Sequence, residues 1–94
     1  MIITIISPIR HIEQCMKIYR NYSVLGDIVL IPVDLNGEFS ERFCKEGLKL
    51  LHKERIKMCD KVIVNNYNNY LGEDTIEEIE YAKSINKEIE YYHH

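Results

Sequence analysis

The chain opens with a near-continuous apolar run, and two further apolar runs follow at intervals long enough for a helix. The first covers residues 1–6, the second residues 27–33 and the third residues 61–65. A run without regular polar alternation is typical of a strand that is buried on both faces, as in a parallel sheet. Parallel strands need long crossover connections, usually helical. The spacing of the runs therefore predicts an α/β fold.

Helices are expected over residues 8–22, residues 40–58 and from residue 74 or 75 to residue 86. Ser7 is suited to cap the first helix, and Pro8 is favoured in a first turn. Gly47 weakens the second helix by about 1 kcal/mol relative to alanine, which leaves two shorter helices as an alternative. Apolar sides at helical spacing are formed by Ile9, Ile12, Cys15, Met16 and Tyr19 in the first helix, and by Phe43, Cys44, Leu48, Leu51, Arg55 and Met58 in the second.

A more polar, alternating segment at residues 87–92 predicts a fourth strand at a sheet edge. Strands and helices that alternate in this way imply right-handed parallel crossovers. We therefore expect residues 1–94 to form a single domain, a flavodoxin-like three-layer α/β/α sandwich with a parallel four-stranded sheet of order 2-1-3-4. Ninety-four residues are few for such a sheet, so a homo-oligomer, a dimer or larger, is expected to cover the exposed flanks.

Composition excludes several classes of function. The net charge of −3 does not favour a nucleic acid polymer as partner. No apolar run approaches the ~20 residues of a membrane span, and no leader is recognised, so a cytoplasmic protein is expected. Cys15, Cys44 and Cys59 form no CxxC pair, which predicts reduced thiols without a metal site. No cofactor motif is found, and His93-His94 is either natural or the remnant of a tag.

Ligands of this architecture bind beyond the carboxyl ends of the strands, where the strand order reverses. The segment after the first strand and the loop at residues 65–75 meet there. The Ser7 hydroxyl, the Arg10 guanidinium and free backbone N–H groups would suit a phosphate. The alternative is that Ser7 only caps a helix and that Arg10 is solvated. His11 is interpreted as a lone exposed histidine.

The loop that follows the third strand contributes further candidates for ligand binding. The Asn65 amide could hydrogen-bond the hydroxyl groups of a ligand, and the Tyr70 ring could stack on a base or sugar. Gly72 permits a positive φ or a close approach of the backbone to a ligand. These residue types predict a polar small-molecule site without a metal.

Glu78 is the principal candidate for chemistry, because it borders the apolar side of the last helix close to its start. The competing interpretation is a capping box from Thr75 to Glu78, in which the carboxylate returns to the Thr75 backbone N–H. The residues alone favour the capping box, and the ligand site is the alternative. His52 and Arg55 are interpreted as part of a solvated helix face.

Three stretches resemble a known family. Ser7-Pro8-Ile9-Arg10 is similar to a Ser-x-Arg phosphate loop, and residues 51–64 resemble a helix that leads through an aspartate into the third strand. Residues 70–82 resemble a Tyr-x-Gly-x-Ser-Thr loop followed by a Glu-hydrophobic-x-x-Ala helix. Together they make the chain similar to the nucleoside 2-deoxyribosyltransferase-like superfamily, which includes deoxynucleoside 5′-monophosphate N-glycosidases, and in particular to its small bacterial and phage members.

The resemblance implies an N-glycosidase or deoxyribosyltransferase in which Glu78 is the nucleophile that attacks the anomeric carbon. It implies no cofactor and a nucleoside or nucleotide as ligand. Family enzymes often have an aspartate where this chain has Asn65 or Asn66. The alternatives are a non-catalytic nucleotide-binding module and a small structural or interaction protein. The implied substrate-binding residues are Ser7, Ile9, Arg10, Asn65, Tyr70, Gly72 and Thr75.

Overall fold

The computed structural model describes residues 1–34 and 41–94 and, for residues 41–43, the backbone alone. Among these residues, four strands form one parallel sheet: β1 (Ile2–Ile6), β2 (Ile28–Leu30), β3 (Lys61–Asn66) and β4 (Glu88–His93). Their order across the sheet is β2-β1-β3-β4, which confirms the predicted order 2-1-3-4. β2 is shorter than the predicted residues 27–33. It ends two residues before Pro32, which has no N–H to donate to a neighbouring strand.

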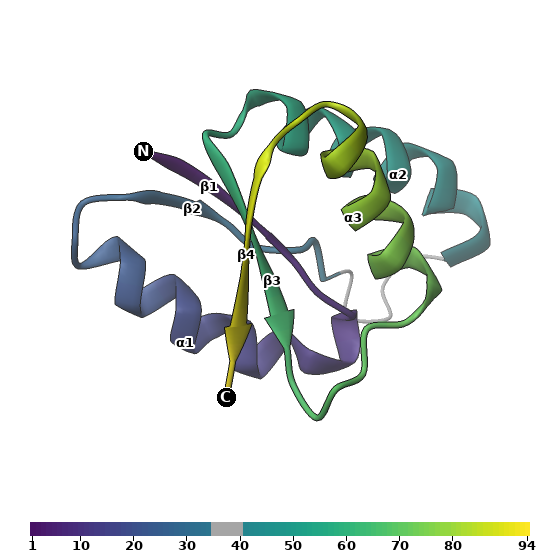
Figure 1. Ribbon diagram of the computed structural model, residues 1–94. Coiled ribbons are helices and arrows are strands. Elements are labelled where there is room, and N and C mark those ends of the chain that lie inside the picture. Colours follow the sequence, from purple (N-terminus) through teal and green to yellow (C-terminus); the bar gives the residue numbers. More distant parts are fainter. Residues whose placement is uncertain (35–40) are drawn as a thin grey trace.

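The helices cover both faces of this sheet, and the predicted three-layer sandwich is confirmed. α1 (Ile12–Ser23) lies on one face, and α2 (Glu41–Met58) and α3 (Glu73–Ser84) lie on the other (Figure 1). A 3-10 turn, Ile9–His11, precedes α1. α2 continues through Gly47 as one helix, so the alternative of two shorter helices is wrong.

The sheet separates two apolar cores, because successive residues of a strand point to opposite faces. Both β1 and β3 are buried on the two faces, as their apolar runs predicted. The core under α2 and α3 contains Ile6, Ile56, Cys59, Val62, Val64, Ile79 and Ala82. The core under α1 contains Ile3, Ile5, Cys15, Ile18 and Ile63.

The side of α1 that is buried differs from the predicted side. Cys15 and Ile18 are fully buried, whereas Ile9 and Tyr19 are exposed. Cys15 belongs to the predicted side, whereas Ile18, three residues further along α1, does not. Cys15 and Ile18 are buried because they pack with Ile3, Ile5 and Ile63 in the core under α1.

The predicted apolar side of α2 is also wrong in part. Leu51 and Met58 are exposed, and the buried residue between them is Ile56. Ser40, the predicted first residue of this helix, and the Phe43 side chain lie outside the described part of the chain. The side of α2 that faces the sheet includes polar residues, which an apolar pattern does not mark.

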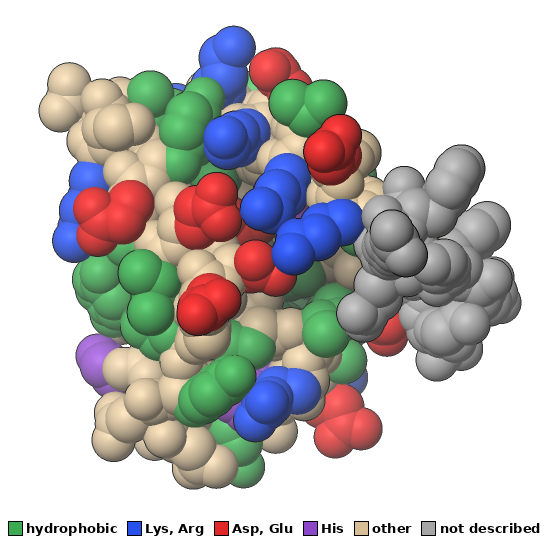
Figure 2. Space-filling view, turned by 90° about the vertical axis from the view of Figure 1, so that its right-hand side faces the viewer, with side chains coloured by type: hydrophobic (Ala, Val, Ile, Leu, Met, Phe, Trp, Pro, Cys, Tyr) green, Lys and Arg blue, Asp and Glu red, His purple; other side chains and the backbone are tan. Residues whose placement is uncertain are grey.

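The surface over α2 and α3 is mixed in charge. Figure 2 shows lysine and arginine side chains next to aspartate and glutamate side chains on this side of the molecule. Within residues 1–34 and 41–94, no helix is long and apolar enough to cross a membrane.

Candidate functional site

An open cleft of about 970 Å³ lies beyond the carboxyl ends of the strands. Its walls are the segment after β1, the segment after β2, the loop before α3, and the facing sides of α2 and α3 (Figure 1). This is the switch point of the sheet, where ligands of such folds bind. The cleft brings together seven of the residues predicted from the sequence, namely Ser7, Ile9, Arg10, Tyr70, Gly72, Thr75 and Glu78.

The Glu78 carboxylate contacts the His52 imidazole across the cleft wall. His52 Nδ1 and Glu78 Oε1 lie 2.6 Å apart, and their side chains are 24% and 20% exposed. Because an ionised carboxylate can only accept hydrogen bonds, Nδ1 is the donor. The contact joins α2 to α3 and fixes one of the two carboxylate oxygens.

The start of α3 excludes the capping box as the role of Glu78. Gly72 is the N-cap residue, with φ 77° and ψ 165°, and no side chain caps the helix. Thr75 lies within the first turn and is buried. The capping interpretation is therefore wrong, because the helix begins before Thr75 and Glu78 faces His52 instead of the chain end.

The sequence interpretation missed the roles of His52, which lines the cleft, and of Arg55, which holds the same helix in place. Neither lies on a solvated face: Arg55 Nη1 donates a hydrogen bond of 2.6 Å to the Ile31 carbonyl, and the Thr4 hydroxyl donates one of 3.0 Å to the Arg55 carbonyl. These bonds fix α2 against the middle of β1 and against the residue that follows β2. Apolar spacing could not have found their roles, because both side chains are polar and Arg55 directly precedes the buried residue Ile56.

Asn65 is the predicted site residue that the structure does not bring into the cleft. It is fully buried, and its Nδ2 donates to the Ser7 hydroxyl at 3.0 Å, to the His11 carbonyl at 3.2 Å and to Cys15 Sγ at 3.4 Å. Its Oδ1 contacts His94 Nε2. The amide therefore connects β3 to the segment after β1 and has no free group for a ligand.

The same network corrects the predictions for Ser7 and His11. Ser7 caps no helix, because its hydroxyl donates to the Pro8 carbonyl. His11 is buried rather than exposed, and its ring contacts the Tyr67 ring edge-on, with centroids 4.9 Å apart. The turn that these residues stabilise places Ile9 and Arg10 at the cleft.

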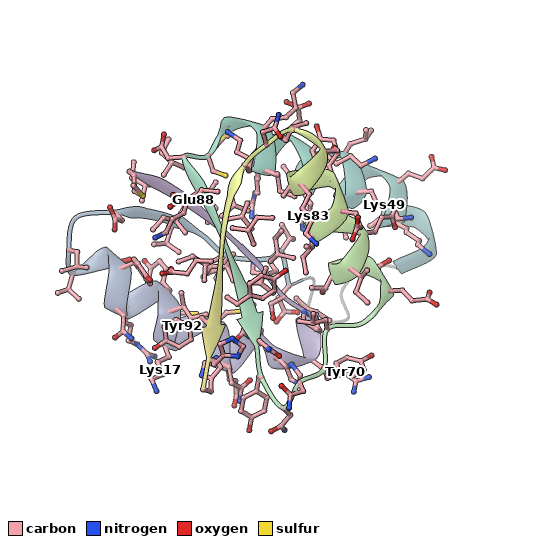
Figure 3. All side chains as sticks on the ribbon, in the orientation of Figure 1. Lys17, Lys49, Tyr70, Lys83, Glu88 and Tyr92 are labelled. Carbon is pink, nitrogen blue, oxygen red and sulfur yellow. The ribbon has the colours of Figure 1, made fainter. Side chains whose placement is uncertain are left out.

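Arg10 and Tyr70 pair across the mouth of the cleft. The guanidinium carbon lies 4.1 Å from the centre of the Tyr70 ring, a cation–π distance. Figure 3 shows Tyr70 in the loop that leads into α3. Gly72 packs against this ring, since a Cβ atom at Gly72 would lie 3.4 Å from the Tyr70 hydroxyl. One face of the predicted stacking residue is thus already covered by the protein.

Opposite charges line the two sides of the cleft. The side chain of Lys49 on α2 points toward α3 (Figure 3), where its Nζ lies 3.7 Å from Glu77 Oε2. Lys53 Nζ lies 5.5 Å from the centre of the Tyr81 ring. The further charged residues of the lining are Asp34, Lys45, Glu73 and Asp74. The cleft therefore offers both cationic and anionic groups to a ligand.

Burial raises the pKa of the Cys15 thiol, while its contacts with Ser7 and Asn65 act in the opposite direction. The thiol is consequently not an activated nucleophile. Among the described residues, no group of three or more His, Cys, Asp or Glu side chains is arranged to hold a metal ion. The carboxylate of Glu78 is the candidate for chemistry in the cleft.

A parallel sheet of order 2-1-3-4 with a cleft at its switch point defines an α/β protein of the doubly wound, flavodoxin-like class. The solved structure of the 2-desoxiribosyltransferase from Leishmania mexicana has the same fold. It aligns with a TM-score of 0.64 and 20% sequence identity, over 98% of this chain and 63% of that one. This chain therefore spans less than two thirds of that structure, and the likeness shows the shared fold. No protein-family model and no curated protein matches the sequence.

Proposed function

We propose that the chain cleaves or transfers at the N-glycosidic bond of a nucleoside or nucleoside 5′-monophosphate, with Glu78 as nucleophile. The observation that carries this proposal is the Glu78 carboxylate, which lines the switch-point cleft and is held by His52 instead of capping α3. The fold shared with a 2-desoxiribosyltransferase supports the choice of substrate class.

The proposed reaction has two steps at the anomeric carbon, C1′. A Glu78 oxygen forms a bond to C1′ while the C1′–N bond breaks, and the base leaves with the electron pair and takes up a proton. Water or a second base then attacks C1′ and releases the carboxylate, as in a retaining glycosidase. Ser7, Ile9 and Arg10 would line the 5′ side of the sugar.

The proton for the leaving base has to come from another group, because Asn65 is buried away from the cleft. Asp34, Glu73 and Asp74 also line the cleft, and we assign them as candidates for this general acid.

The test is to incubate the protein with a panel of deoxynucleosides and deoxynucleoside 5′-monophosphates and to measure the released base by chromatography. Wild type should release base and Glu78→Gln should not, because the amide is a poor nucleophile of nearly the same shape. Glu80→Gln is the matched control: it removes another carboxylate of α3, which pairs with Lys83 and does not line the cleft, and it should leave release unchanged. An acid-quenched wild-type sample should contain a deoxyribosyl adduct on Glu78.

Thermal stability separates binding from catalysis in the same panel. A ligand at ~100 times its dissociation constant adds about 2.7 kcal/mol to the free energy of unfolding. Stabilisation without base release would contradict the enzyme and favour the non-catalytic binding module. Neither stabilisation nor release by any member of the panel would contradict a nucleotide site altogether.

A homo-oligomer belongs to this proposal as well. Val24 and Leu25 are 78% and 74% exposed at the turn that follows α1, and burial of such side chains against a second copy is favourable. Light scattering after size exclusion should give a mass above the 11.2 kDa of one chain.

A further inference from the structure

We infer that His52 is a positioning residue that fixes Glu78 Oε1 and leaves Oε2 to attack the sugar. The inference rests on the proposed function, in which Glu78 is the nucleophile. Its basis is the 2.6 Å contact between Nδ1 and Oε1. Among the described residues, Oε2 has no hydrogen-bonding or ion-pair partner. The two oxygens of one carboxylate are therefore held in different environments.

The geometry excludes the two ring nitrogens of His52 as groups that exchange a proton or a hydrogen bond with substrate. Nδ1 is engaged by Glu78, and Nε2 is buried without a hydrogen-bonding partner in the described part of the chain. A substrate atom cannot reach a nitrogen that is shielded from solvent. His52 therefore acts through Glu78, and neither ring nitrogen is available as a general acid for the leaving base.

The backbone that carries His52 is itself fixed. Three residues further along α2, Arg55 is bound on two sides, through its guanidinium to the Ile31 carbonyl at 2.6 Å and through its own carbonyl to the Thr4 hydroxyl at 3.0 Å. These bonds connect α2 to the residue that follows β2 and to β1 itself. A donor on such a rigid element can hold a nucleophile within the small tolerance that catalysis requires.

Positioning matters for this reaction because the attacking oxygen must approach C1′ opposite the departing base. A misplacement of about 1 Å can cost about 10²-fold in rate. Without the bond to His52, the carboxylate would rotate freely about the last side-chain torsion of Glu78, and no oxygen would be held in the attacking position. The bond thus raises the fraction of molecules in which the nucleophile is aligned.

The competing explanation is a structural contact that only joins α2 to α3. The neighbouring contact of this kind is Lys49–Glu77, whose side chains are 45% and 57% exposed. A structural role predicts that any substitution of His52 changes stability and activity together. A positioning role predicts that activity follows the location of the hydrogen-bond donor.

Two amide variants separate these explanations. The side-chain nitrogen of His52→Asn replaces Nδ1, whereas that of His52→Gln reaches the position of Nε2, and His52→Phe has no donor. We expect His52→Asn to keep kcat within about tenfold of wild type, and His52→Gln and His52→Phe to lose about 10²-fold in kcat with KM little changed. The melting temperatures of the three variants, measured alongside, identify any loss that comes from unfolding.

The outcomes distinguish this inference from the proposed function. Base release that depends on Glu78 but is equal in all three His52 variants would overturn the positioning role and leave the proposed nucleophile in place. Equal losses in His52→Asn and His52→Gln would also overturn it, because activity would not follow the donor. Absence of base release by wild type would overturn both.

Discussion

His52 Nδ1 and Glu78 Oε1 lie 2.6 Å apart and connect two helices that pack side by side over the same face of the sheet. The two side chains are 24% and 20% exposed, so solvent screens their interaction less than that of a surface pair. The contact explains why a glutamate one turn into α3 faces the cleft instead of capping its own helix. The coupling energy of the two side chains therefore measures how strongly α2 is held against α3.

We predict that the His52 and Glu78 substitutions are not additive. His52→Ala and Glu78→Ala should each lower the free energy of unfolding, and the double variant should show a coupling energy of about 0.5–3 kcal/mol, the range for residues in contact. Urea denaturation of the four proteins measures it. The Lys49 and Glu77 pair is the control, with an expected coupling below about 1 kcal/mol because it is exposed. A coupling near zero for His52 and Glu78 would contradict the contact.

The strands could be predicted from the sequence, but the side of each helix that faces the sheet could not. The runs at residues 1–6 and 61–65 are buried on both faces and determine a parallel sheet almost by themselves. The inward side of α2 depends on partners far along the chain. Arg55 turns inward because the Ile31 carbonyl accepts a hydrogen bond from its guanidinium, and His52 turns inward because Glu78 contacts its imidazole. Apolar spacing carries no information about such pairs.

In the candidate site, too, some residues could be predicted from the sequence and others could not. Glu78, Arg10 and Tyr70 were predictable because strand ends and helix starts converge at a switch point. The role of Asn65 was not, since an asparagine that completes a buried network and one that binds a ligand have the same sequence signature. Only the positions of Ser7, His11 and Cys15 around its amide distinguish them.

We predict that Asn65→Asp strongly destabilises the fold. The substitution replaces the Nδ2 donor by an oxygen that faces the His11 carbonyl, which can only accept hydrogen bonds. An unmatched polar group at this fully buried position should cost about 3 kcal/mol or more. Thermal unfolding measures the loss. Asn66→Asp, at the neighbouring and less buried position, is the control, and an equal small effect of both substitutions would contradict the network.

We predict opposite effects for alanine at two glycines. Gly72 has φ 77° and ψ 165°, a conformation that is nearly restricted to glycine, so Gly72→Ala should lose about 1–3 kcal/mol of stability. At Gly47, within α2, an added Cβ would have no neighbour within 4 Å, and Gly47→Ala should gain about 1 kcal/mol. Chemical denaturation of both variants measures the change in the free energy of unfolding. A stabilising Gly72→Ala would contradict the positive φ at the N-cap of α3.

We predict a pH-dependent contribution from Tyr22 and Glu90, which join α1 to β4. The Tyr22 hydroxyl donates a hydrogen bond of 2.7 Å to Glu90 Oε2. This bond is the main reason that the pKa of Tyr22 is raised to about 12. The same bond, assisted by the charge of Lys61 and opposed by burial, lowers the pKa of Glu90 below its ordinary value of 4.5.

Each shift fixes one limit of the pH range over which the bond stabilises the fold. Because the pKa of Glu90 is lowered on folding, its contribution is present above pH 4.5 and is lost as the pH falls through the lower folded value. Because the pKa of Tyr22 is raised on folding, its contribution is present below pH 10.0 and is lost as the pH rises from there to about 12.

Tyr22→Phe should therefore destabilise the protein most between about pH 5 and pH 10, and progressively less outside that range. The loss should not exceed about 1 kcal/mol, because Glu90 is 45% exposed and solvent screens the pair. Urea denaturation of wild type and variant across pH 3–12 measures the difference at each pH. Tyr19→Phe, on the same helix but with no hydrogen bond from its hydroxyl to the described residues, should show no such dependence. A Tyr22→Phe loss that stays constant from acid to alkaline pH would mean that the hydroxyl acts through packing and not through the Glu90 carboxylate.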